Sequence, residues 1–175
     1  MTRADYRAAI AQSGVLARLA AFDPHVAGTP PLALDLPESD IDILCYAPDL
    51  EAFAVEVQTA FEAEAGFALR RWREGSAVIA TFKALGWDFE IFAQQIPVAQ
   101  QQGWRHFVVE RRLLAVGGAP FHAAVMQLRR DGLKTEPAFA AAQRLPGNPY
   151  AAVLALAGAE PAALIAAGFA IHGSA

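Results

Sequence analysis

Residues 28–43 read GTPPLALDLPESDIDI, and this stretch decides the fold. It ends in two aspartates, Asp40 and Asp42, that alternate with isoleucines. Residues two positions apart on a β-strand point to the same face, so we expect adjacent carboxylates on one face and Ile41 and Ile43 on the other. Like charges this close repel each other. A divalent cation such as Mg²⁺ relieves that repulsion, because hard ions prefer carboxylate oxygens as ligands.

A third carboxylate follows on a later predicted strand, 86–93, which reads GWDFEIFA. Glu90 is bracketed there by apolar neighbours, and Asp88 shares its face two residues earlier. Three carboxylates can hold one or two ions that bridge nucleotide phosphates and activate an attacking hydroxyl. We therefore predict a catalytic site for Mg²⁺ or Mn²⁺ at Asp40, Asp42 and Glu90. Asp88 is the alternative third ligand.

The Gly-Thr pair at the start of the stretch suits phosphate binding. Gly28 lets the backbone approach a phosphate closely, and Thr29 adds an N–H group and a hydroxyl that can bind phosphate oxygens. The alternative interpretation is a plain turn ahead of two prolines.

Two basic residues are further candidates for nucleotide contact. Lys83 lies on the predicted strand before Glu90. Arg105 stands next to His106 on a predicted helix, and the guanidinium fork of arginine suits phosphate. The alternative for this second pair is a surface arginine beside a half-buried histidine. Glu136, near the start of a later predicted helix, is interpreted as helix-dipole chemistry.

The composition limits the classes of function. Of the 175 residues, 55% are hydrophobic and 18% are charged, which fits one folded domain with a full core and excludes a disordered chain. The net charge of -4 argues against strong nonspecific binding to duplex nucleic acid. Cys45 is the only cysteine, so no intrachain disulfide can form and the cytoplasm is the expected compartment.

No membrane segment is expected. Polar side chains such as Asp5 and Arg18 interrupt the apolar pattern that a secretory signal requires at the N-terminus. Residues 151–171 approach the length of a membrane span, but Glu160 and Pro161 break the run in its middle. We interpret this segment as two short buried helices.

The order of predicted elements is a helix, a strand-rich half and a helical half. Periodicity predicts strands over 25–27, 32–36, 40–46, 67–73, 76–84 and 86–93. It predicts helices over 4–21, 49–64, 99–116, 120–130, 136–143, 149–157 and 161–168. Gly117-Gly118 is a predicted helix stop, and Thr135 and Asn148 are predicted caps. We expect one α+β domain over 1–175, with a sheet-rich catalytic half at 1–97 and a helical half at 98–175.

The combination of Gly-Thr, Asp-x-Asp and a later acid between apolar residues resembles the nucleotidyltransferase (polymerase β-like) superfamily. Within it, the chain resembles an uncharacterised bacterial family of single-domain nucleotidyltransferase-like proteins. The matching stretches are Gly28-Thr29-x-Pro31-Leu32, Ser39-Asp40-Ile41-Asp42-Ile43, Phe89-Glu90-Ile91-Phe92, Trp104-Arg105-His106 and Gly132-Leu133-Lys134-Thr135-Glu136-Pro137-Ala138-Phe139. Each stretch is short, and Asp-x-Asp alone would be a weak signal.

The resemblance implies a mixed β-sheet of about five strands flanked by helices, with metal at Asp40, Asp42 and Glu90. It also implies transfer of a nucleotidyl group from an NTP to an acceptor hydroxyl or phosphate that the sequence does not identify. Two positions depart from the family pattern. Thr29 stands where serine is usual and keeps the hydroxyl, and Pro30-Pro31 stand where many members begin a short helix.

Two other functions remain open from the sequence. One is a catalytically inactive nucleotide-binding or regulatory module, for example a toxin–antitoxin partner. The apolar surface of the helical half suits such a protein partner or a homo-oligomer. The other is a structural domain whose acids are coincidental.

Overall fold

The computed structural model describes residues 3–72, 76–160 and 163–164. The chain divides into two compact units. The sheet unit comprises Met1–Pro31 and Pro37–Trp104, and the helical unit comprises Leu32–Leu36 and Arg105–Ala175. The boundary after Trp104 lies close to the expected division between residues 97 and 98. That both halves form a single domain stays a prediction.

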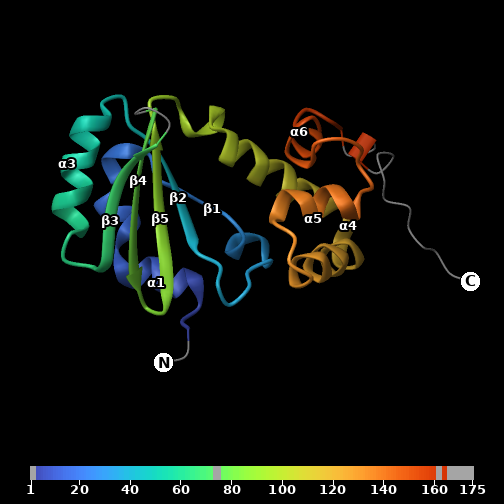
Figure 1. The fold of residues 1–175 in the computed structure, drawn as a ribbon, viewed down its shortest axis with the longest axis horizontal. Helices are drawn as coiled ribbons and strands as arrows, with labels where there is room; N and C mark the ends of the chain where they lie inside the picture. Colours follow the sequence, from blue (N-terminus) through green and yellow to red (C-terminus); the bar gives the residue numbers. More distant parts are fainter. Residues whose placement is uncertain (1–2, 73–75, 161–162, 165–175) are drawn as a thin grey trace, which may run out of the picture. The chain divides into compact units, whose positions relative to one another are not determined.

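The sheet unit is built on a mixed five-stranded sheet (Figure 1). Its strands are β1 (His25–Ala27), β2 (Ile41–Tyr46), β3 (Ala65–Trp72), β4 (Ala77–Ala84) and β5 (Trp87–Gln94). They lie in the order β1-β2-β5-β4-β3, with β2 and β5 parallel and all other neighbours antiparallel. The prediction of a mixed sheet of about five strands is confirmed.

Helices cover one face of this sheet. They are α1 (Tyr6–Ser13), α2 (Val15–Arg18), the 3-10 helix η1 (Ala20–Phe22) and α3 (Leu50–Phe61). The core of the unit joins their apolar side chains to buried strand residues such as Ile41, Ile43 and Phe89. Asp5 and Asp49 start α1 and α3, because each carboxylate accepts hydrogen bonds from two backbone N–H groups of the first turn.

The opposite face of the sheet carries polar residues. Because side chains alternate along a strand, Asp42 on β2 and Glu90 on β5 point away from the buried Ile41 and Phe89. Both acids are half-buried, whereas the two apolar neighbours are fully buried. This face of the sheet unit positions the candidate site.

The helical unit contains most of α4 together with two shorter helices. The elements after the sheet are η3 (Val98–Gln100), α4 (Gln102–Arg130), α5 (Thr135–Ala142) and α6 (Pro149–Leu154). α4 is interrupted at Gly118, whose φ of 62° and ψ of -161° are not helical, so the predicted stop at Gly117-Gly118 is confirmed. Phe121 and Phe139 join α4 to α5, with ring centroids 5.8 Å apart. The expected helical C-terminal half is thus confirmed.

The predicted strand at 32–36 is wrong. Ala33 has a φ of 55°, which is incompatible with an extended strand. Its carbonyl accepts a hydrogen bond from His122 Nε2 at 2.9 Å, and the Leu34 carbonyl accepts one from Arg129 Nε at 3.1 Å. Side chains of α4 therefore satisfy the backbone groups that a strand would have paired with its neighbours.

Two helix predictions also need correction. The predicted helix 4–21 is split by Gly14, whose φ of 64° lies in the left-handed region. The predicted cap at Thr135 is wrong, since Thr135 is the first residue of α5 and its hydroxyl accepts from Arg129 Nη1 instead. The predicted helix at 161–168 lies largely outside the described residues.

Within the described part of the chain, no helix combines the length and the apolar character that crossing a membrane requires.

Candidate functional site

Two of the three predicted acids lie on the polar face of the sheet. β2 and β5 run parallel, and their register places Asp42 directly opposite Glu90. Neighbouring strands lie about 4.8 Å apart, so the backbones of these two residues are close and their side chains lie on one face. The Asp42 carboxylate itself lies against Gly28, on the β1 side of β2. The alternation of apolar and polar residues predicted that both acids lie on the less buried face of the sheet. The register of β2 and β5 adds that they stand opposite each other.

The third acid, Asp40, lies just before β2 and acts on Glu90. Burial raises the pKa of the Glu90 carboxyl above its ordinary value, and the negative charge of Asp40 raises it further. Arg70 lowers this pKa, and its Nη2 lies 3.8 Å from Glu90 Oε2. The charge of Asp40 and burial therefore both oppose ionisation of Glu90, and a cation at this position would offset them.

Gly28 lies directly against the Asp42 carboxylate. β1 pairs antiparallel with β2, with Ala27 opposite Asp42, and Gly28 follows with a φ of 75°. A Cβ atom at Gly28 would lie 2.1 Å from Asp42 Oδ2, far inside van der Waals contact. Glycine alone accommodates both the left-handed backbone and this close approach. The Gly-Thr turn, with half-buried Thr29, thus begins beside one of the predicted metal ligands.

The two prolines after this turn form a helix. Pro30–Leu32 is the 3-10 helix η2, so the two prolines, although they depart from the family pattern, still lie in a short helix. Proline is tolerated in the first turn of a helix, because its φ near -65° is helical and its missing N–H group has no partner there.

Lys83 and Asp88 pair with each other at the end of the β4–β5 hairpin. They stand opposite on the two strands, and Lys83 Nζ donates to Asp88 Oδ1. Both side chains are largely exposed, at 64% and 56%. Asp88 and Glu90 thus each have a cationic partner, Lys83 and Arg70 respectively. They differ in that Glu90 is half-buried and lies opposite Asp42, whereas Asp88 is exposed. The choice of third ligand and a phosphate contact for Lys83 stay predictions.

The ion pair between Arg70 and Glu90 was missed by the sequence analysis. Arg70 lies opposite Ile79 on β4, which lies opposite Phe92 on β5. This row of residues shares the polar face and is adjacent to the row that contains Glu90. The alternation within β3 indicates on which faces its side chains lie, but only the register across three strands brings Arg70 to the site.

A separate group of potential metal ligands lies in the helical unit. Among the described residues, the group whose ligand atoms all lie within 4.8 Å of one another is His106, Glu110 and Glu136. The three acids of the sheet unit are spread more widely. Their donor set still fits Mg²⁺, which is commonly bound through one or two carboxylates together with water and substrate phosphates. Arg105 belongs to the helical unit, where it is exposed, and its contact with phosphate stays a prediction.

Comparison with known proteins identifies a family for the chain. A protein-family model described as "Domain of unknown function (DUF4269)" matches residues 8–156, which is most of the chain. No curated protein matches the chain.

Two solved polymerase structures are similar to this chain. The MgGTP-bound crystal structure of the Cid1 poly(U) polymerase is similar with a TM-score of 0.55 and 14% identity, over 71% of this chain and 40% of that chain. The polymerase core of TRAMP, an RNA surveillance complex, has a TM-score of 0.47 and 16% identity, over 85% of this chain and 46% of that chain. This chain thus spans less than half the length of either structure. The first likeness confirms a nucleotidyltransferase-like fold, and at this identity it concerns the fold alone.

Proposed function

The chain belongs to the DUF4269 family of unknown function, and we propose that it is a metal-dependent nucleotidyltransferase. It moves a nucleotidyl group from an NTP to an acceptor hydroxyl or phosphate. The observation that carries this proposal is the position of Asp42, which lies opposite Glu90 on a parallel strand and against the backbone of Gly28. Acidic ligands and a phosphate-binding turn are thereby adjacent within the sheet unit.

Asp40, Asp42 and Glu90 hold Mg²⁺ or Mn²⁺ in this proposal. When bound, such ions neutralise charge on the NTP phosphates and activate an attacking hydroxyl. The chemistry of the donor set supports this role, because all three ligands are carboxylates and hard cations prefer oxygen. The environment supports it as well, since burial and Asp40 both oppose ionisation of Glu90 and a cation reverses that effect.

The residues of the chain itself bind and position the reactants. Gly28 and Thr29 bind phosphate oxygens through backbone N–H groups and the threonine hydroxyl. Glu90 positions the acceptor hydroxyl and accepts its proton. Lys83 supplies a further phosphate contact within the sheet unit.

The proposal extends to the setting in which the chain acts. The expected partners are a nucleotide and an acceptor, with the helical unit available to a protein partner or a second copy. Cytoplasmic location belongs to the proposal, since a single cysteine suits a reducing compartment. Bacterial origin belongs to it through the resemblance to the bacterial family alone.

The experiment is transfer of label from NTPs that are radiolabelled at the α-phosphate. Each common NTP is incubated with the protein, Mg²⁺ or Mn²⁺, and total RNA, protein or metabolite acceptors. The Asp40→Asn plus Asp42→Asn variant should lose at least about a hundredfold in rate, because metal ions supply several kcal/mol of stabilisation and each ~1.4 kcal/mol is a factor of ten. Glu56→Gln removes one exposed charge on α3 and should leave the rate unchanged.

Transfer by the double variant at the wild-type rate would contradict the proposal. A melting temperature that rises with Mg²⁺ and NTP, but no transfer to any acceptor, would instead favour the inactive nucleotide-binding or regulatory module. Absence of both a thermal shift and transfer would count against both functions.

A further inference from the structure

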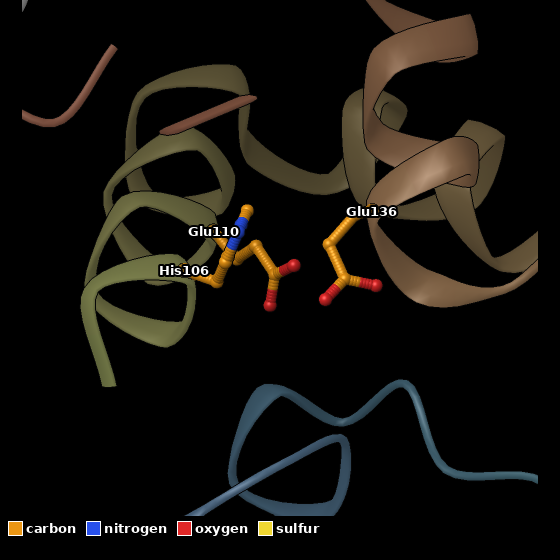
Figure 2. Close-up of side chains that lie close together, drawn as sticks. All are labelled: His106, Glu110 and Glu136. Atoms are coloured by element: carbon orange, nitrogen blue, oxygen red, sulfur yellow. The ribbon is translucent and has the colours of Figure 1, made fainter. Parts of the chain in front are cut away.

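One histidine and two glutamates of the helical unit converge on one point (Figure 2). His106 and Glu110 lie four residues apart on α4, so they share one face of the helix. Glu136 is the second residue of α5 and directs its carboxylate toward that face (Figure 2). One ligand atom from each residue lies within 4.8 Å of the other two.

Two of these side chains are buried, and three of their polar atoms have no hydrogen-bond partner. His106 is 4% exposed and Glu110 is 5% exposed. Both imidazole nitrogens of His106 and the Oε1 atom of Glu110 are buried atoms without a hydrogen-bond partner. Buried polar groups are nearly always satisfied, because leaving one unsatisfied costs about 1–3 kcal/mol. One nitrogen of a neutral imidazole carries a proton, so the other nitrogen of His106 and Oε1 of Glu110 are the two atoms that can donate an electron pair. Two such atoms in one place indicate a ligand that accepts electron pairs.

The nearby cation does not fill this role. The charge of Arg129 acts on Glu110, but its Nε donates to the Leu34 carbonyl at 3.1 Å. Its Nη1 donates to the Thr135 hydroxyl at 2.7 Å. These two donors thus bond to neutral oxygens, and the two carboxylates and the imidazole stay directed at one another.

From this arrangement we infer that His106, Glu110 and Glu136 form a binding site for one divalent transition metal ion of the Zn²⁺ type. One imidazole nitrogen and two carboxylate oxygens are a donor set that Zn²⁺ accepts, with ligand distances of about 2.0–2.2 Å. Three protein ligands leave a further position open to water or another ligand. The ligand atoms lie within 4.8 Å of one another. Small side-chain rotations would allow one ion between them to reach these ion–ligand distances. The bound ion ties α4 to α5.

This inference does not depend on nucleotidyl transfer. Its test uses a variant that lacks the two aspartates of the sheet unit, so that they cannot contribute to metal binding. The full chain carries Asp40→Asn plus Asp42→Asn as a background and is stripped of metal with a chelator. Calorimetric titration with Zn²⁺ alone should then show one ion per chain. Titration with Co²⁺ should give visible absorption bands, whose position and intensity report the number of ligands around the ion.

Matched variants decide whether the three residues are the ligands. Glu136 is half-buried, so Glu136→Gln disturbs packing least, and it should weaken Zn²⁺ binding at least about tenfold. Glu136→Asp keeps a carboxylate and should retain more of the affinity than the glutamine variant. Asp131→Asn removes an exposed carboxylate that follows α4 and should leave the affinity unchanged.

Two results would overturn the inference. One is absence of Zn²⁺ binding in the background variant, which would mean that the buried groups are satisfied by protons or water instead. The other is equal affinity in Glu136→Gln and Asp131→Asn, which would place the ion elsewhere. His106→Gln should likewise weaken Zn²⁺ binding. If that variant fails to fold, as judged by circular dichroism, the comparison of the Glu136 variants still decides. Failure here leaves the transfer assay unaffected, since that assay concerns the acids of the sheet unit.

Discussion

Asp42 and Glu90 stand opposite each other on two parallel strands that are joined in the chain by a helix and two further strands. Parallel strands require such a long connection, which here consists of α3, β3 and β4. The pairing of the two acids therefore depends on strand register. A shift by one residue would turn Glu90 to the buried face, because side chains alternate.

The first prediction concerns which acid of β5 is the third ligand. Glu90→Gln should reduce nucleotidyl transfer at least about a hundredfold, whereas Asp88→Asn should retain most of the rate. The reason is that Glu90 is half-buried and lies opposite Asp42, while Asp88 is exposed at the end of the hairpin. The measurement is the initial rate of label transfer at saturating NTP. The reverse order of the two variants would assign the site to Asp88.

A second prediction concerns the close approach of Gly28 to Asp42. Gly28→Ala places a methyl group 2.1 Å from Asp42 Oδ2, in addition to the strain of a left-handed alanine. Gly14→Ala is the matched control, since its φ is similar and no atom lies within 4 Å of an added Cβ. Urea unfolding should show a cost of about 1 kcal/mol for Gly14→Ala, the strain alone, and a larger cost for Gly28→Ala.

Binding of Mg²⁺ and NTP should separate the same two glycine variants. Gly28→Ala should lose the thermal shift that Mg²⁺ and NTP produce, because the methyl group displaces the Asp42 carboxylate. Gly14→Ala should keep this shift. Equal costs of unfolding and equal thermal shifts in the two variants would show that the Gly28 contact has no role.

Local pattern was enough to predict most of the sheet unit. Alternating apolar residues marked β2 and β5, and the same alternation put Asp42 and Glu90 on the less buried face. The segment 32–36 also alternates, yet it forms no strand, because its carbonyls bond to side chains of α4. Such long-range partners leave no trace in local periodicity.

The candidate sites show the same limit. His106 and Glu110 are four residues apart on a predicted helix, so their shared face could be predicted from the sequence. Glu136 reaches them only through the packing of α5 on α4, and its place near a helix start suggested a simpler role. Similarly, the contact of Arg70 with Glu90 follows from the register of three strands.

A third prediction concerns the reactivity of Cys45. The thiol is fully buried, and burial raises its pKa to about 12, with a further contribution from the charge of Asp23. The thiolate is the reactive form, so alkylation of the native protein near pH 8 should be slower than that of a free cysteine by on the order of a thousandfold. Mass spectrometry after iodoacetamide treatment measures this rate, with the urea-unfolded chain as reference. Rapid labelling of the folded protein would contradict the buried position on β2.

A fourth prediction concerns the pH dependence of stability in the metal-free protein. Burial and the charge of Glu136 raise the pKa of the Glu110 carboxyl to about 8, while Arg129 opposes them. A carboxyl whose pKa is raised on folding stabilises the protein fully below its unfolded pKa, about 4.3, and this contribution is lost as the pH rises through about 8.

Urea unfolding of the wild type and of Glu110→Gln, with a chelator present throughout, isolates this contribution. The neighbouring His106, whose pKa is lowered by burial, titrates in both proteins, so its effect largely cancels in the difference. The stability of the wild type relative to the variant should fall by a few kcal/mol between about pH 4.3 and pH 8, at no more than about 1.4 kcal/mol per pH unit. Since glutamine cannot ionise, a difference that does not change with pH would mean that Glu110 keeps an ordinary pKa in the folded protein. The carboxylate would then already have a cationic or hydrogen-bonding partner without metal, and its buried position would need another explanation.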